Sequence, residues 1–278
     1  MFYIDAHCDS VNPASNPPHL DTERMRVTGS GIQFMACFSP DFEAVSRMFD
    51  KLDGCGLPNV LNGADVTPDG WKILRAVEGG DCLFGGSKGE DVRRLEYLHR
   101  RGMRSLGLTW NNENPLSGGA STPEKGLTAL GAEFIERMED MGIAVDLAHI
   151  SERGFWDAME TVKKPPIVSH TAAYALRSHR RNLTDDQIRA VAERGGVIGV
   201  CLYPEFLGGS DIGTFLRHIN HIRNTGGSGC AGIGTDFDGI ESLPDGISSV
   251  EDMPRILEML DEKTAGLNFA RVLREVLI

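Results

Sequence analysis

The sequence predicts a (β/α)8 barrel, an α/β fold, built as a single domain over residues 1–278. Short apolar, β-branched runs alternate with helical patterns, and eight such runs are present. Several are apolar throughout, which is typical of parallel strands covered on both faces. The expected strands are Tyr3–His7, Ile32–Phe38, Ile73–Val77, Ser105–Thr109, Ile143–Leu147, Pro166–Ser169, Val197–Leu202 and Cys230–Thr235.

Helical patterns fill most of the intervals between these runs. Ser151 is a favourable N-cap residue, and Thr184 with Gln187 fits a capping box whose helix ends at Gly195-Gly196. The expected helices are Glu90–Arg100, Leu127–Met141, Glu152–Val162, the segment after Thr184, Ile212–Asn224 and Gly266–Leu277. Two segments, Pro13–Pro18 and Leu52–Gly70, are expected to be loops.

An open, doubly wound sheet is the competing arrangement of alternating strands and helices. That fold commonly carries a glycine-rich phosphate loop after its first strand, and none follows Tyr3–His7 here. A linker rich in Pro or Ser is also missing from the sequence, so we expect one barrel domain rather than two smaller units.

Composition and charge exclude several classes of protein. Hydrophobic residues make up 41% of the chain and charged residues 24%, a mixture typical of globular proteins. The net charge of −12 disfavours nucleic acid and anionic membranes as partners. Neither a membrane-spanning apolar run nor a secretion signal is recognised, and the six cysteines form no CxxC pair, so we expect a cytoplasmic protein.

Polar residues of the metal-binding type follow five of the expected strands. Catalytic groups of such barrels gather at the C-terminal ends of the strands. His7 and Asp9 are two apart, which places both side chains on one side of an extended chain. The complete set is His7, Asp9, Glu78, His149, His170 and Asp236.

Each of these residues, taken alone, is better explained without a metal. A glutamate is usually a solvated surface group, a histidine is often a hydrogen-bonded structural residue, and Asp236 could belong to a turn. Together they supply nitrogen and oxygen ligands for zinc or a similar divalent ion. Five ligands exceed what one open catalytic ion needs, and they suit two ions that share a bridging carboxylate. His218 and His221 are expected to pack outside the barrel.

Several longer segments resemble the membrane (renal) dipeptidases, peptidase family M19 of the metal-dependent amidohydrolase superfamily. The VDLAH and RRNLTDDQ blocks are the most specific of these. The matching segments are DAHCD at 5–9, VEGG at 77–80, GMRSLGLT at 102–109, GIAVDLAHIS at 142–151, PPIVSHTAAYALRSHRRNLTDDQI at 165–188, GGVIGV at 195–200 and GIGTDFDG at 232–239.

The resemblance implies a metallo-dipeptidase with two Zn²⁺ ions, although another divalent metal would also fit. It assigns His7 and Asp9 to one ion, His149 and His170 to the other, and Glu78 to the bridge. The implied reaction is hydrolysis of the peptide bond of dipeptides, including those with a C-terminal D-residue, by a hydroxide that bridges the ions. A homodimer is the implied assembly.

The resemblance also implies roles for residues outside the ligand set. Asp236 matches a catalytic general acid/base, and Arg181 matches an arginine that holds the terminal carboxylate of the substrate. A fixed guanidinium suits that carboxylate because the contact can be bidentate. Tyr203 falls near a substrate-contacting tyrosine.

The chain departs from the family at Trp110, where many members carry a histidine that steadies the tetrahedral intermediate. An indole N–H is a donor only, so it could replace that contact with the substrate. Cys8 stands where the family has Asn, and strand alternation predicts that its thiol faces away from the ions.

Two alternatives remain open from the sequence. One is a related amidohydrolase that acts on another amide, a cyclic amide or a lactone. Many of those enzymes use a carbamylated lysine as the bridge, and Glu78 favours the peptidase instead. The other is a catalytically impaired barrel that binds metal without turnover, for which the change at Trp110 is the support.

Overall fold

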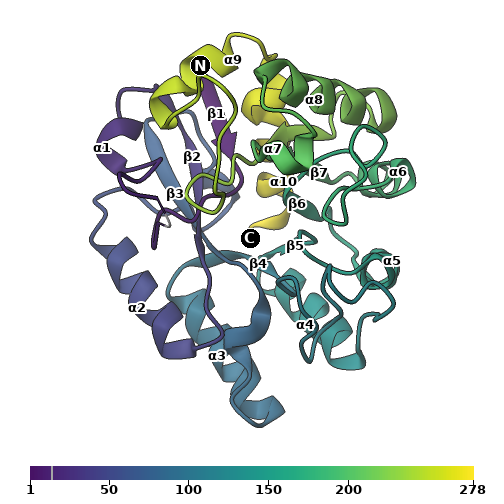
Figure 1. Ribbon diagram of the computed structural model, residues 1–278. Helices are drawn as coiled ribbons and strands as arrows, with labels where there is room; N and C mark the ends of the chain where they lie inside the picture. The colour runs from purple at the N-terminus through teal and green to yellow at the C-terminus, as the bar shows by residue number, and fades with distance from the viewer. Residues whose placement is uncertain (14) are drawn as a thin grey trace.

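Eight parallel strands close into a barrel, in which each strand pairs with its neighbours in sequence and Asp5 pairs with Ile233 to join the last strand to the first (Figure 1). The computed structural model describes residues 1–13 and 15–278. The predicted (β/α)8 barrel is therefore confirmed, and the alternative of an open doubly wound sheet is excluded. The strands are β1 (Phe2–Asp5), β2 (Ser30–Cys37), β3 (Trp71–Val77), β4 (Met103–Gly107), β5 (Ala144–Asp146), β6 (Ile167–Thr171), β7 (Val197–Val200) and β8 (Ala231–Ile233).

Helices surround the barrel and cover the outer faces of the strands (Figure 1). They are α1 (Thr22–Met25), α2 (Phe42–Asp53), α3 (Lys88–Arg100), α4 (Ala129–Asp140), α5 (Glu152–Thr161), α6 (Asp185–Glu193), α7 (Pro204–Leu207), α8 (Ile212–Gly226), α9 (Met253–Leu257) and α10 (Asn268–Val276). Single turns of other helix types lie at Gly63–Asp65, Gly80–Leu83, Val250–Asp252 and Lys263–Leu267. Within the described part of the chain, none of the helices has the length and apolar character that crossing a bilayer requires.

The predicted helix starts are confirmed where a capping residue marks them. The Ser151 hydroxyl accepts a hydrogen bond from the Gly154 N–H, and Thr184 and Gln187 form the expected capping box. The expected loop Leu52–Gly70 is wrong at its beginning, because Leu52 is in the last turn of α2. The N-cap Asp41 starts α2, and its apolar face packs on the core. Of Pro13–Pro18, Ala14 lies outside the described residues, and the others form no helix or strand.

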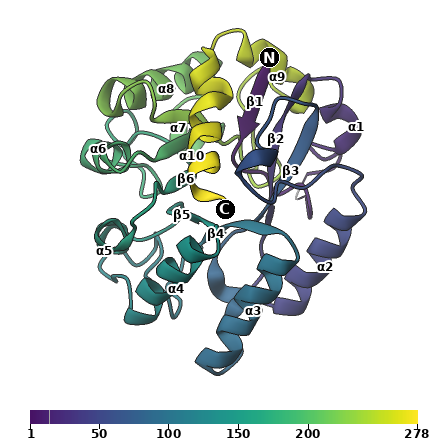
Figure 2. The same cartoon turned by 180° about the vertical axis from the view of Figure 1, so that it is seen from behind.

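Helix α10 seals the N-terminal end of the barrel, where it lies in front of the strands in Figure 2. Phe269 and Leu273 of this helix pack against inward-facing Ile4, Phe34 and Leu74 of the strands, and all five side chains are fully buried. Truncation of such a phenylalanine to alanine typically costs about 3–5 kcal/mol. With this end filled by apolar side chains, the polar strand-end residues gather at the opposite end.

Candidate metal centre

The six predicted ligand and acid residues meet at the C-terminal end of the barrel, and we call them the strand-end cluster. Their burial ranges from nearly complete to partial, with His7 and His170 each only 2% exposed. The cluster borders a cavity of about 510 Å³. Its members are His7, Asp9, Glu78, His149, His170 and Asp236.

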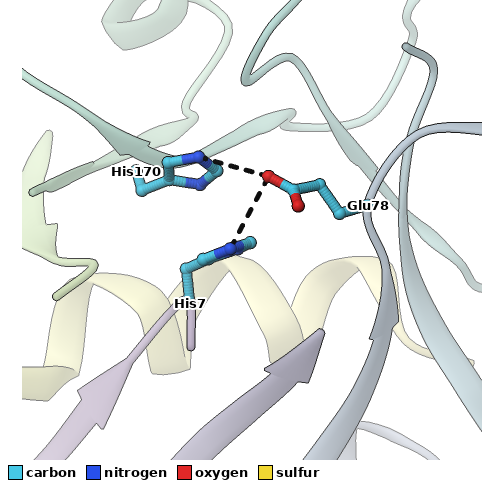
Figure 3. A group of neighbouring side chains, drawn as sticks. All are labelled: His7, Glu78 and His170. Atoms are coloured by element: carbon cyan, nitrogen blue, oxygen red, sulfur yellow. Dashed lines mark ion pairs between the residues drawn. The ribbon is translucent and has the colours of Figure 1, made fainter. Parts of the chain in front are cut away.

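One carboxylate oxygen is central to this cluster. Glu78 Oε1 lies 2.9 Å from His149 Nε2, 3.5 Å from His170 Nε2 and 3.7 Å from His7 Nε2. Figure 3 shows the side chains of His7 and His170 converging on Glu78 from different strands. A single oxygen that faces three imidazoles has the position that a shared metal ligand requires.

The remaining two carboxylates approach His7 as well. Its Nε2 lies 3.3 Å from Asp9 Oδ2 and 3.7 Å from Asp236 Oδ1. Ligand atoms of His7, Asp9 and Asp236 lie within 4.8 Å of one another, and so do those of His7, Glu78 and His170. The cluster therefore contains two overlapping groups of possible metal ligands, and His7 belongs to both.

The backbone is strained where two cluster residues leave their strands. His149 and Asp236 have positive φ angles of 64° and 63°, which side-chain-bearing residues rarely adopt and which recur at functional sites. Gly239 packs so closely on Asp9 and Asp236 that any Cβ atom would overlap both carboxylates. The predicted strands Tyr3–His7 and Cys230–Thr235 run past the observed ends of β1 at Asp5 and of β8 at Ile233.

Two buried aspartates beneath the cluster escaped the sequence analysis. Asp5 accepts hydrogen bonds from the N–H and hydroxyl of Thr235, at 2.8 and 2.7 Å, and so joins β1 to the segment after β8. Asp146 accepts from the N–H groups of Ala148 and Ser169, at 3.0 and 2.9 Å, and joins β5 to β6. An acidic residue within an apolar strand was the signal that could have identified them. A buried polar group is nearly always hydrogen-bonded, so such a residue predicts a link to a neighbouring segment.

Burial and mutual contact shift the pKa values of most cluster residues. Burial lowers the pKa of both His149 and His170, so these imidazoles are neutral. Burial alone would also lower the pKa of His7, but Glu78, Asp9 and Asp236 raise it to about 10. Burial also raises the pKa of the Glu78 carboxyl group to about 8, so ionising all three carboxylates together in this buried site is costly without cations.

The neutral imidazoles face each other with their metal-binding nitrogens. His149 Nε2 and His170 Nε2 lie 2.8 Å apart, while their Nδ1 atoms contact Asn111 Oδ1 at 3.0 Å and Ser169 Oγ at 2.9 Å. When each Nδ1 donates outward, both Nε2 lone pairs point into the cluster. This donor set of imidazole nitrogens and carboxylate oxygens fits divalent cations such as zinc.

Arg181 supplies an unbalanced positive charge in the wall of the same cavity. The residue is 7% exposed, and its Nη2 donates to the His170 carbonyl at 3.2 Å. Among the described residues, no carboxylate forms an ion pair with its guanidinium. A buried, unpaired guanidinium is costly, so this position favours an anionic ligand.

Aromatic residues line the cavity beside these charges. The Trp110 indole stacks on the His149 imidazole, with ring centroids 5.9 Å apart. The Tyr203 hydroxyl donates a hydrogen bond of 2.6 Å to Glu241, an exposed residue at the cavity rim that sequence reasoning missed. As expected, the Cys8 thiol faces away from the cluster and donates to the Phe34 carbonyl.

His218 has a structural role, as expected from its place in α8. Its Nδ1 accepts a hydrogen bond from the Ala173 N–H at 2.9 Å, and its Nε2 donates to the Leu207 carbonyl at 3.0 Å. Both ring nitrogens are therefore used, and this histidine joins the loop after β6 to α7.

Comparisons with known proteins agree with this architecture. The family model for membrane dipeptidases (peptidase family M19) matches residues 61–277. An uncharacterised dipeptidase of Schizosaccharomyces pombe is 32% identical over 283 residues, covering 90% of this chain and 68% of its own. A protein of Klebsiella pneumoniae encoded in the pqqA 5′ region is 34% identical over 215 residues, covering 69% of this chain and 79% of its own.

Solved structures share the fold at lower sequence identity. A metallo peptidase from Rhodobacter sphaeroides, bound to a phosphinate mimic of the dipeptide L-Ala-D-Ala, has a TM-score of 0.87 and 23% identity, with 99% of both chains covered. Dipeptidase AC, a metallo peptidase of family M19, has a TM-score of 0.85 and 23% identity, with 99% of this chain and 98% of its own covered.

Proposed function

Since the chain belongs to the membrane dipeptidase family (peptidase family M19) and is a metal-dependent hydrolase of peptide bonds, we propose that it hydrolyses dipeptides at a centre of two zinc ions. The observation that carries the proposal is the position of Glu78, whose single oxygen lies within 4 Å of three imidazole nitrogens beside a cavity. His7 and Asp9 would hold one ion, His149 and His170 the other, with Glu78 shared. When bound, the ions supply a Lewis acid for the peptide carbonyl and lower the pKa of a coordinated water to about 7.

Asp236 is proposed to move the proton that the leaving amine needs. Burial raises the pKa of its carboxyl group, so this side chain can hold a proton nearer to neutral pH than an exposed aspartate can. The Cys201 sulfur lies 3.5 Å from Asp236 Oδ2, and burial keeps that group a neutral thiol by raising its pKa. The thiol therefore donates to one carboxylate oxygen and leaves the other free for the reaction.

Arg181 is proposed to bind the C-terminal carboxylate of the substrate, because its guanidinium is buried and lacks an ion-pair partner in the described chain. Trp110 and Tyr203 would form the wall against which the substrate lies. A volume of about 510 Å³ is in the range of small-molecule sites. A carboxylate anchor at a fixed distance from the metal centre limits the substrate to short peptides with a free C-terminus.

Acceptance of a D-residue at the C-terminal position is part of the proposal. Its support is the related metallo peptidase from Rhodobacter sphaeroides, which was solved with a mimic of L-Ala-D-Ala. We also propose a cytoplasmic homodimer. The six cysteines are free thiols, which agrees with a reducing compartment.

The test combines elemental analysis with a substrate panel on the zinc-loaded protein. The panel contains L-Ala-L-Ala, L-Ala-D-Ala, the C-terminal amide of each, a cyclic dipeptide and a lactone. We expect about two ions per chain, turnover of both free dipeptides and loss of activity on the amides. Turnover of the cyclic compounds alone would establish a different amidohydrolase, and a fully loaded protein without any turnover would be an impaired barrel. The mass in solution tests the dimer.

A further inference from the structure

Two consecutive residues after β4 contact His149 from different sides. The Trp110 indole stacks on the imidazole, with 5.9 Å between centroids and 30° between the ring planes, a geometry favourable for aromatic pairs. Asn111 Oδ1 lies 3.0 Å from His149 Nδ1, at the edge of the same ring. We call these two residues the Trp110–Asn111 clamp.

The clamp is itself held in place by backbone contacts. The Asn111 carbonyl accepts a hydrogen bond from the Ser121 N–H at 2.7 Å, and the Ala120 N–H donates to the His149 carbonyl at 2.8 Å. Gly119 packs directly on the Asn111 carbonyl group, where a Cβ atom would overlap it. One loop therefore ties the backbone of Asn111 to the backbone of His149.

His149 needs such support more than the neighbouring ligand His170 does. His170 lies within β6, and its Nδ1 contacts the hydroxyl of Ser169 from the same strand. His149 lies beyond the end of β5 with a φ of 64°, so no strand fixes its side chain. Metal-ligating histidines almost always donate their other ring N–H to an outer partner, which fixes the ring orientation and the tautomer.

We propose that Trp110 and Asn111 are positioning residues for His149, which hold its ring so that the Nε2 lone pair faces the metal centre. The proposal rests on the proposed metal centre. Stacking on the indole restricts rotation of the ring, and donation from Nδ1–H to the amide oxygen leaves Nε2 unprotonated. In this proposal Trp110, at the position where the chain departs from its family, orients a metal ligand as well as contacting the substrate.

The test measures metal retention in purified zinc-loaded variants dialysed against rising concentrations of a chelator. Asn111→Leu removes the acceptor, Asn111→Asp keeps it, and Asn112→Leu is the matched control at the exposed neighbour. Trp110→Ala removes the stacked ring, and Trp110→Phe keeps one. We expect Asn111→Leu and Trp110→Ala to lose one of two ions at roughly 10–100-fold lower chelator concentration. Asn111→Asp, Trp110→Phe and Asn112→Leu should stay within about threefold of the unmodified protein.

Two controls keep this test separate from folding and from turnover. Melting temperatures of the metal-free variants measure any loss of stability separately, and metal retention is compared only among variants that are folded at the dialysis temperature. The proposed positioning role of the clamp is refuted if Asn111→Leu and Trp110→Ala retain both ions as tightly as the parent. It is also refuted if Asn111→Asp loses metal as readily as Asn111→Leu. Failure of the unmodified protein to cleave any dipeptide would instead overturn the proposed function and leave these metal measurements unchanged.

Discussion

The replacement Glu78→Gln tests the arrangement of the metal centre most directly. Glutamine has nearly the shape of glutamate, but it removes one negative charge and half of the acceptor capacity at the point where three imidazoles meet. We expect the metal content to fall from about two ions per chain to one or fewer, because the shared ligand is lost. Loss of several kcal/mol of transition-state stabilisation should lower kcat by at least about 100-fold.

The same replacement should stabilise the metal-free protein. Glu78 shares the His7 imidazolium with Asp9 and Asp236 at distances between 3.3 and 3.7 Å, and burial raises the pKa of its carboxyl group to about 8, so its ionisation at pH 8 destabilises the folded state. An incompletely compensated buried group costs about 1–3 kcal/mol. Since 1 kcal/mol shifts the melting temperature of a domain of roughly this size by about 2–4 °C, we expect a rise of roughly 2–12 °C at pH 8 in excess chelator.

Elemental analysis and thermal melting in excess chelator measure these two effects separately. Glu241→Gln is the matched control, because it removes the same charge from the exposed rim of the cavity and should change neither metal content nor the melting temperature of the metal-free protein. Two retained ions in Glu78→Gln would refute the shared ligand. A metal-free Glu78→Gln protein less stable than its parent would refute this account of the buried Glu78 carboxylate.

Three further predictions concern residues around the centre. Gly239→Ala should lower metal content and activity while the barrel stays folded by circular dichroism, because its Cβ atom would overlap Asp9 and Asp236; full activity would show that this segment can move aside. Arg181→Ala should raise KM much more than it lowers metal content, measured by steady-state kinetics and elemental analysis, and an equal loss of both would indicate a structural role. Burial lowers the pKa of His218 in the folded state below its unfolded value of about 6.5, so its contribution to stability is complete above that pH and is lost as the pH falls below it. Urea unfolding should therefore show that the stability advantage of the parent over His218→Gln shrinks between pH 7.5 and 5; an advantage that is constant or grows would contradict this assignment.

The barrel was predictable because its signals are local. A buried parallel strand requires a short apolar run, and a helix start requires a capping side chain, so all eight strands and most helices could be placed from neighbouring residues alone. Helix α2 was missed although Asp41 caps it and the buried Val45, Phe49 and Leu52 recur at helical spacing, so this local signal was available in the sequence. The strand ends were placed too late where the backbone turns toward the cluster, since no local pattern announces a positive φ at Asp236.

The ligand types were also visible in the sequence, because catalytic residues of barrels follow the strands. The residues that hold those ligands were not. Asn111 contacts His149 across 38 positions of sequence, and Asp5 contacts Thr235 across 230. An asparagine in a loop or an aspartate in a strand has many possible partners, and only the closed barrel selects one.

The sequence by itself therefore determined the repeating strand and helix pattern and the chemical character of the strand ends. Only the tertiary structure decided that Glu78 Oε1 faces three imidazoles, that Arg181 is buried without an ion-pair partner among the described residues, and that Trp110 stacks on His149. The physical reason is that hydrophobic periodicity and capping act over a few residues, whereas these contacts arise from closure of the barrel, which brings together side chains from distant strands.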